Sequence, residues 1–370
     1  MAKGLFTQGM CVLLRQSVGA DEVRSALSEF EYEGVHESAA DGDGAQTLVF
    51  RFREEVQGHL LVTISQQPWP DDLGDPDSTP ERFIAWSLGQ YGPYSFPGCL
   101  KRAGQQSWGW DEGEEVVTEH CGHLRCLISY VFGSENFGTA DEEEGSLEQL
   151  DERLDDLGND LGLGIVEPDG HEVPVLPADY EPLGEMTFLT RAVEAILQLP
   201  QASCYFNPAG EVIRDRDGLR RGLNHAWSHD LPPLEMWTNV RLFQADSDWS
   251  LMDTVGNSQF DVPDVEAVFQ TGKYEPIDVQ GFLRSAALYM LQSDEDIEDG
   301  DTADGPGDLT WRAIRCEDGL SDPPRETVRW VPQDETDPPE ALLDPGEDED
   351  LDDEDFGDDA DDDEFQTDLI

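Results

Sequence analysis

Two stretches of dense acidic sequence divide this chain into parts that can and cannot build a hydrophobic core. Residues 334–370 contain 20 Asp and Glu, no Lys or Arg, and few apolar residues. Residues 139–185 contain 16 acidic residues against one basic residue. Such segments bury too little apolar surface to offset the entropy lost on ordering. We therefore expect an N-terminal half at 1–138, an acidic insertion or linker at 139–185 with one helix at 147–161, a C-terminal half at 186–333 and a disordered acidic tail at 334–370.

The acidity extends into the globular sequence. The net charge is −61, of which −41 falls on the 333 residues before the tail, and Lys occurs only three times. A field of this sign repels phosphate and anionic lipid, so we expect no nucleic acid partner and no membrane partner. It favours contact with a protein that presents a basic surface. A cytoplasm rich in salt, or codon bias combined with acidic insertions, would also explain the excess without any partner.

The cysteines and apolar runs indicate a cytoplasmic protein. Six cysteines are scattered over about 300 residues, mostly in apolar runs, which does not resemble a compact disulfide framework. Residues 1–14 lack the long apolar region of a signal peptide. No run approaches the 18 apolar residues typical of a membrane span. We expect buried free thiols in a reducing compartment.

Apolar periodicity in both halves predicts short strands alternating with amphipathic helices. The fold class expected is α+β, with antiparallel or mixed sheets, packed helices and two halves of similar size. In the first half we expect strands at 10–15, 47–53, 60–65 and 120–132, and helices at 21–30 and from residue 80. In the second half we expect strands at 204–206, 211–214, 234–243, 249–254, 311–316 and 327–331, and helices at 188–199 and 279–291.

A series of short motifs runs in order along the chain. They are the Val12-Leu13-Leu14 strand, His120-x-x-His123-Leu124, Leu189-Thr190-Arg191, Cys204-Tyr205-Phe206, Ala209-Gly210-Glu211-Val212, Trp237-x-Asn239-Val240-Arg241-Leu242-Phe243, Leu251-Met252-Asp253-Thr254-Val255-Gly256, Val262-Pro263-Asp264-Val265-Glu266 and Asp299-Gly300-Asp301-Thr302. This pattern resembles an uncharacterised bacterial family, the domain of unknown function 4261 family. The resemblance covers most of residues 10–332 outside the acidic insertion, and its more specific motifs lie near the C-terminal end. It implies a shared α+β fold and no particular activity.

The densest polar group beside apolar sequence contains Asp253, Thr254, Gly256, Asp264 and Glu266. Carboxylates grouped in this way can bind a cation or act as general acid and base. The structural interpretation, which we favour, is that Asp253 and Thr254 cap a turn and Asp264 caps a short helix.

Two arginines and one turn complete the candidate binding residues. Arg241 and Arg325 could each hold a ligand carboxylate. The interpretation that we favour is that each neutralises a neighbouring carboxylate such as Asp253 or Glu266. Asp299 and Asp301 lie in a sequence that only partly matches a calcium loop, because its twelfth position is Thr310 instead of Glu. A turn after a helix is the interpretation that we favour.

His120 and His123, with two nearby cysteines, are weak candidates for metal ligands. In an extended strand the four side chains would point to both faces, so one ion could not collect them. We therefore expect no metal site and no cofactor. The sequence also lacks the common nucleophile-elbow, phosphate-loop and dinucleotide-binding motifs.

These observations favour a non-catalytic, protein-binding module of the immunity-like or regulatory kind. The first alternative is an enzyme of unrecognised type, with Asp253, Asp264, Glu266 and Arg241 lining one cleft. The second alternative is a salt-adapted protein whose acidity has no partner role. Convergence of those four side chains in a cleft would favour the enzyme.

Overall fold

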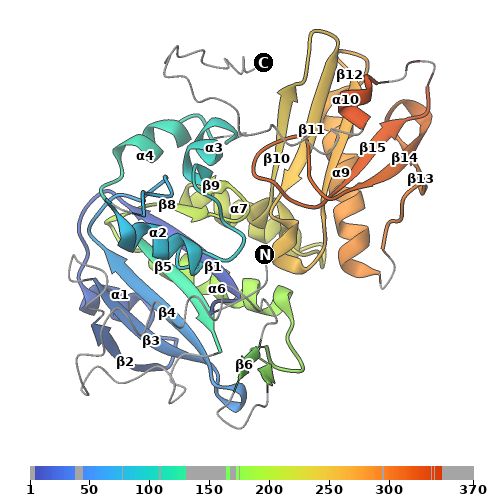
Figure 1. Cartoon of the computed structure of the whole chain (residues 1–370). Coiled ribbons are helices and arrows are strands. Elements are labelled where there is room, and N and C mark those ends of the chain that lie inside the picture. The colour runs from blue at the N-terminus through green and yellow to red at the C-terminus, as the bar shows by residue number, and fades with distance from the viewer. Residues whose placement is uncertain are drawn as a thin grey trace. The chain divides into compact units, whose positions relative to one another are not determined.

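The computed structural model describes residues 5–37, 45–76, 78–107, 110–130, 164–166, 172–174, 176–293, 296–334, 336 and 338–343. The chain forms two compact units, Met1–Trp237 and Thr238–Ile370 (Figure 1). Each unit combines one large sheet with packed helices, so the predicted α+β class is confirmed. The helix expected at 147–161, most of the acidic insertion and the tail after residue 343 lie outside the described residues.

The first unit is built on a seven-stranded antiparallel sheet. Its strand order is β2-β3-β4-β5-β1-β8-β9, with the apolar strands β5 and β1 near its centre (Figure 1). Its strands are β1 (Gln8–Leu14), β2 (Tyr32–Glu37), β3 (Gln46–Arg53), β4 (Gly58–Ser65), β5 (Gly122–Ser129), β8 (Ala202–Asn207) and β9 (Val212–Arg214), and a separate two-stranded sheet joins β6 (Gly164–Val166) to β7 (Glu172–Pro174).

Helices pack on both faces of this sheet. The long helix α6 (Pro182–Ile196) contacts β1 and β5, and its apolar side chains Met186, Leu189 and Val193 are fully buried. The opposite face carries an aromatic core that includes Trp69, Trp86, Cys99 and Phe206. The other helices of the unit are α1 (Ala20–Ala26), α2 (Pro80–Ser87), α3 (Cys99–Gln105), α4 (Gly113–Glu119), α7 (Arg216–Trp227) and α8 (Leu234–Trp237).

The first unit extends further along the chain than the predicted N-terminal half. Strand β8 pairs with β1, with Val12 opposite Tyr205, so residues from beyond the acidic insertion complete the first sheet. The Thr190 hydroxyl of α6 also contacts the Met10 sulfur of β1. Because these partners lie about 190 residues apart, local patterns place them in separate halves, whereas strand pairing joins them.

The second unit is a six-stranded mixed sheet covered on one face by α9 (Pro276–Gln292). Its order is β10-β11-β12-β15-β14-β13, and β12 and β15 run parallel. Val279, Leu283 and Ala287 of α9 are fully buried against Val265, Trp311 and other side chains of the sheet. The strands are β10 (Asn239–Gln244), β11 (Trp249–Val255), β12 (Asp264–Gln270), β13 (Thr302–Gly305), β14 (Leu309–Cys316) and β15 (Thr327–Pro332).

Two local predictions in this region were wrong. The strand expected at 234–243 begins as the short helix α8, since Pro232 and Pro233 start a turn whose carbonyls accept from Leu234 and Met236. Asp264 begins strand β12 and not a helix. In the described positions after residue 333, Asp334 bonds to Lys273 and Tyr274, and Glu340–Leu343 forms helix α10.

None of the helices in the described ranges is both long enough and apolar enough to cross a membrane.

Candidate functional site

Four charged side chains form one row across the sheet of the second unit. Arg241 on β10 lies opposite Asp253 on β11, which lies opposite Glu266 on β12, which lies opposite Arg329 on β15. Neighbouring residues on paired strands project to the same face, so the register alone brings the four together. Each is at most 1% exposed. The order of charges across the sheet is therefore positive, negative, negative, positive.

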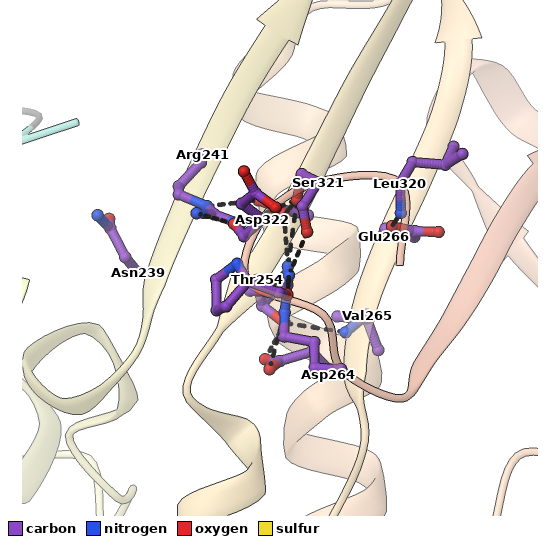
Figure 2. A network of polar contacts seen from close by, with 12 residues as sticks. Asn239, Arg241, Thr254, Asp264, Val265, Glu266, Leu320, Ser321 and Asp322 are labelled. Atoms are coloured by element: carbon purple, nitrogen blue, oxygen red, sulfur yellow. Dashed lines mark hydrogen bonds and ion pairs between the residues drawn. The ribbon is translucent and has the colours of Figure 1, made fainter. Parts of the chain in front are cut away.

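The row lies on the face opposite α9. Its apolar neighbours on that face are Trp249, Leu251 and Val268, against which Leu320 and Leu342 pack. Alternation along each strand sends Val265 and Ala267 to the α9 core and Glu266 to this second face. Figure 2 shows the loop that carries Leu320, Ser321 and Asp322 passing across the strands at the row.

Asp253 is the centre of the network. Arg241 binds it bidentately, with Nε 3.0 Å from Oδ1 and Nη2 2.6 Å from Oδ2. Arg325 donates from Nη2 to Oδ2 at 2.5 Å, and the Ser321 hydroxyl also donates to Oδ2. Burial by itself would raise the pKa of Asp253, but Arg241 and Arg325 outweigh it and hold the pKa below its usual value. This carboxylate is therefore ionised and fully engaged.

Asp264 is engaged by neutral donors in addition to Arg325. Its Oδ1 accepts from the Thr254 hydroxyl at 2.8 Å and from Asn257 N at 3.1 Å, and its Oδ2 accepts from Gly256 N at 3.2 Å. Arg325 Nε lies 3.3 Å from Oδ2. Burial raises the pKa of Asp264, against the opposing effect of these partners. The carboxylate holds the backbone where β11 turns into the 3-10 helix Asn257–Phe260.

Glu266 and Arg329 link the row to two further segments. Arg329 Nε donates to Glu266 Oε1 at 2.5 Å. Glu266 Oε2 accepts from Leu320 N at 3.1 Å, which fixes the covering loop (Figure 2). Arg329 Nη1 donates to the carbonyls of Leu342 and Leu343, where α10 ends.

The structure brings together seven of the nine candidate binding residues and leaves two elsewhere. Asp299 and Asp301 lie in the turn before β13, where they accept from Arg315 N at 3.3 Å and Glu298 N at 2.9 Å. The seven that meet are Arg241, Asp253, Thr254, Gly256, Asp264, Glu266 and Arg325.

Arg329 and Ser321 also belong to the network, although the sequence analysis did not select them. Arg329 stands inside the buried strand β15, with Val328 and Trp330 beside it. A lone Arg at the centre of an apolar strand is a signal for a buried partner carboxylate, because an unpaired buried charge is costly. No comparable signal marks Ser321.

This arrangement connects strands more readily than it binds a ligand. Asp253, Asp264, Glu266 and Arg241 do converge, as the enzyme hypothesis requires, but they are at most 1% exposed. As far as the structure describes the chain, these four side chains are therefore closed off from solvent and from any substrate. Within the described residues, no three His, Cys, Asp or Glu side chains are grouped as ligands for one metal ion.

The two histidines considered as metal ligands have other contacts in the first unit. His120 lies at the end of α4, where Nε2 accepts from Trp69 N at 2.8 Å and Nδ1 lies 2.5 Å from Val117 O. His123 lies on β5, and its Nδ1 is 3.0 Å from Gln67 O. Burial lowers the pKa of both imidazoles, in the case of His123 to about 3. Both rings are therefore neutral near pH 7.

Comparison with known proteins matches the region that contains most of the network. Residues 253–331 match the family model described as Domain of unknown function (DUF4261), which confirms the resemblance for this segment. The match runs from Asp253 into β15, and so includes the buried pairs Arg325–Asp253 and Arg329–Glu266 but not Arg241. No curated protein and no solved structure matches the chain.

Proposed function

We propose that this chain, whose residues 253–331 match the model of a domain of unknown function, is a non-catalytic module that binds a protein with a basic surface. An immunity-like or regulatory role would use such binding. The proposal rests on one contrast within the second unit: three arginines are buried in internal ion pairs, whereas a group of exposed carboxylates makes no ion pair among the described residues.

The buried side of this contrast is the network described above. Arg241, Arg325 and Arg329 have side chains at most 8% exposed, and each is paired with a buried carboxylate. These three charges stabilise contacts within the sheet. They add little to the positive potential outside the protein, because each is neutralised at contact distance.

The exposed side surrounds the edge strand β13. Six carboxylates are exposed here, and none takes part in an ion pair among the described residues. Arg312, opposite Thr302 on β14, is the exposed cation beside them. We call this group the β13 acidic surface; it consists of Asp296, Glu298, Asp299, Asp301, Asp304 and Asp308.

A surface of this kind suits electrostatic recognition of another protein. Concentrated charge of one sign raises the association rate with a complementary surface and disfavours acidic competitors. Asp299 and Asp301, chosen as candidates from the sequence, belong to this surface. Their hydrogen bonds hold the turn, so the test uses neighbours that make no such bond.

The test compares two variants that lose the same charge. Glu298→Gln/Asp304→Asn/Asp308→Asn removes three charges from the β13 acidic surface, and Asp248→Asn/Glu317→Gln/Asp318→Asn removes three exposed charges elsewhere in the unit. The immobilised full chain is exposed to native lysate at low and at physiological salt. The retained protein is then purified, and its affinity for each variant is measured by calorimetry.

We expect one defined basic partner, bound by the wild type and by the control variant. Its affinity for the β13 variant should fall roughly tenfold, with most of the change in the association rate. Retention of no specific protein, or equal weakening by both variants, would contradict the proposal.

A further inference from the structure

A cavity of about 690 Å³ opens in the first unit, on the face of the sheet opposite α6. This volume is in the range of small-molecule sites. Its lining includes His123 and Arg125 from β5, the segment Ser65–Asp72, which begins at the last residue of β4, and the side chains of Arg82 and Tyr91. The lining residues all belong to the first unit, so the cavity is separate from the charged network of the second unit.

His123 lines this cavity and carries a hydrogen-bond acceptor. Its side chain is 3% exposed, and its Nδ1 lies 3.0 Å from Gln67 O. A carbonyl oxygen can only accept, so Nδ1 carries the proton and Nε2 carries a lone pair. In the part of the chain that the structure describes, Nε2 takes no hydrogen bond. His123 thus offers an acceptor that the donor of a ligand can use.

Arg125 supplies a cation next to this acceptor. It leaves the same face of β5 two residues further on, about 7 Å along the strand, and its side chain is also largely buried. Nη1 donates to Gln90 O at 3.2 Å, and the guanidinium lies 4.9 Å from the centroid of the Tyr91 ring. These contacts fix the charge in place at the wall of the cavity.

Aromatic side chains complete this wall. The Trp69 ring lies edge-on to His123 at 5.3 Å and to Tyr91 at 5.2 Å, measured between ring centroids. Flat, polarizable walls of this kind favour a flat ligand. The neighbouring carboxylates are already engaged: Asp71 accepts from Leu100 N and Lys101 N, and Asp72 pairs with Arg82.

We propose that this cavity binds a small aromatic acid that carries a hydroxyl or N–H donor. The carboxylate lies at Arg125, the donor at His123 Nε2, and the ring between them against Trp69 and Tyr91. The spacing of the two polar groups along β5 is close to the width of one aromatic ring.

The acceptor at His123 distinguishes this class of ligand from simpler anions. A carboxylate or phosphate without a proton would set its lone pairs against the lone pair of Nε2. Protonating His123 would relieve that conflict, but burial and the nearby charge of Arg125 both oppose it. The preferred ligand is therefore anionic at one end and a donor at the other.

Calorimetry of the full chain with three probes tests the contact with Arg125 and the contact with His123 separately. The probes are 4-hydroxybenzoate, benzoate, which lacks the donor, and 4-hydroxybenzyl alcohol, which lacks the charge. We expect 4-hydroxybenzoate to bind about three- to tenfold more tightly than benzoate. This ratio corresponds to the net free energy of one hydrogen bond. The alcohol should bind more weakly than 4-hydroxybenzoate by a similar factor or more.

Two variants and one control assign the preference to residues. His123→Phe should bind 4-hydroxybenzoate and benzoate equally, and Arg125→Met should weaken both acids while leaving the alcohol unchanged. His225→Gln alters an exposed histidine on α7 and should change nothing. In the wild type, the His123 Nε2 nitrogen resonance should shift with 4-hydroxybenzoate and not with benzoate, a readout that requires no variant to fold.

The proposal is overturned by the absence of binding of all three probes at millimolar concentration. Equal affinity for 4-hydroxybenzoate and benzoate, or an unmoved His123 resonance at saturation, would overturn it as well. Neither outcome bears on the protein partner proposed above, which contacts the other unit.

Discussion

Glu266 and Arg329 face each other across the parallel strands β12 and β15, with Arg329 Nε 2.5 Å from Glu266 Oε1. Both side chains are fully buried. Each also holds a separate segment: Glu266 binds Leu320 N in the covering loop, and Arg329 binds the carbonyls that end α10. One ion pair therefore connects two strands, a loop and a helix.

Breaking this pair from one side should destabilise the second unit strongly. Glu266→Leu or Arg329→Met leaves an uncompensated buried charge, and we expect each to lower the free energy of unfolding by about 3–5 kcal/mol. Glu266→Leu/Arg329→Met removes both charges and should cost much less than the sum of the single changes. Urea unfolding with a double-mutant cycle measures the difference.

The control for this cycle is the exposed pair Arg315–Glu326, which is 32% and 54% exposed. Glu326→Gln should change stability by about 1 kcal/mol or less, as for other surface ion pairs. Similar costs at the buried and exposed pairs would show that burial does not set the energetics here.

Asp253 and Asp264 should respond differently to conversion to Asn. Asp253→Asn deprives two buried arginines of their counterion, and we expect a loss of about 3–5 kcal/mol. Asp264→Asn should cost less, because its side-chain oxygen can still accept from Thr254 and the backbone. The pKa of Asp253 is lowered and that of Asp264 is raised, which agrees with a larger loss of stability at Asp253. Urea midpoints at pH 7 compare the variants, and a larger loss for Asp264→Asn would contradict it.

The fold class and most strands followed from local apolar patterns, but β12 did not. It begins with Asp264 and contains Glu266, and these charged residues interrupt the apolar pattern that predicts a buried strand. Glu266 is acceptable there because Arg329 lies opposite, 63 residues later in the chain. The sequence suggested Asp253 or Glu266 as the partner of Arg241 and Arg325, whereas the structure pairs both arginines with Asp253 and pairs Glu266 with Arg329. Strand register, a long-range property, decides which charges meet.

His123 should make stability depend on pH below neutrality. Its pKa is lowered by burial and by Arg125 to about 3, against an unfolded value of about 6.5. The unfolded state therefore binds more protons between these values, so this contribution to stability is complete above about pH 6.5 and is lost as pH falls toward 3. Between pH 7 and 5 we expect a loss of the order of 1–2 kcal/mol.

The difference between wild type and His123→Phe isolates this contribution. Acidification also neutralises surface carboxylates, a background that both proteins share. The wild type should lose more stability than the variant between pH 7 and 5 in urea unfolding. Parallel curves would mean that the imidazole remains accessible to protons.

Potassium chloride should stabilise the chain, with a gain that saturates. Self-repulsion from a net charge of −61 is screened as the Debye length falls from about 10 Å at 0.1 M to about 3 Å at 1 M. We expect most of the increase in melting temperature below about 0.5 M, where screening of surface charges is already strong. A gain that continues steeply into multimolar salt would instead favour the salt-adapted alternative.

Truncation should divide the acidic C-terminal segment into a structural part and a dispensable part. Up to residue 343, it supplies Leu342 to the apolar cluster of Trp249 and Val268 and two carbonyls to Arg329. Asp334 in addition bonds to Lys273 and Tyr274. A chain ending at residue 343 retains all of these contacts, so we expect its free energy of unfolding to stay within about 0.5 kcal/mol of the full chain.

A chain ending at residue 333 loses those contacts together and leaves the Arg329 donors exposed to water or unpaired. We expect it to be less stable by about 2–4 kcal/mol, from lost apolar burial and lost charge-assisted hydrogen bonds. Leu342→Ala in the full chain should reproduce part of this loss, since it removes the apolar contact and keeps the carbonyls. Equal stability of the two truncated chains would mean that α10 contributes nothing to the charged row, and that Arg329 is satisfied by Glu266 and solvent alone.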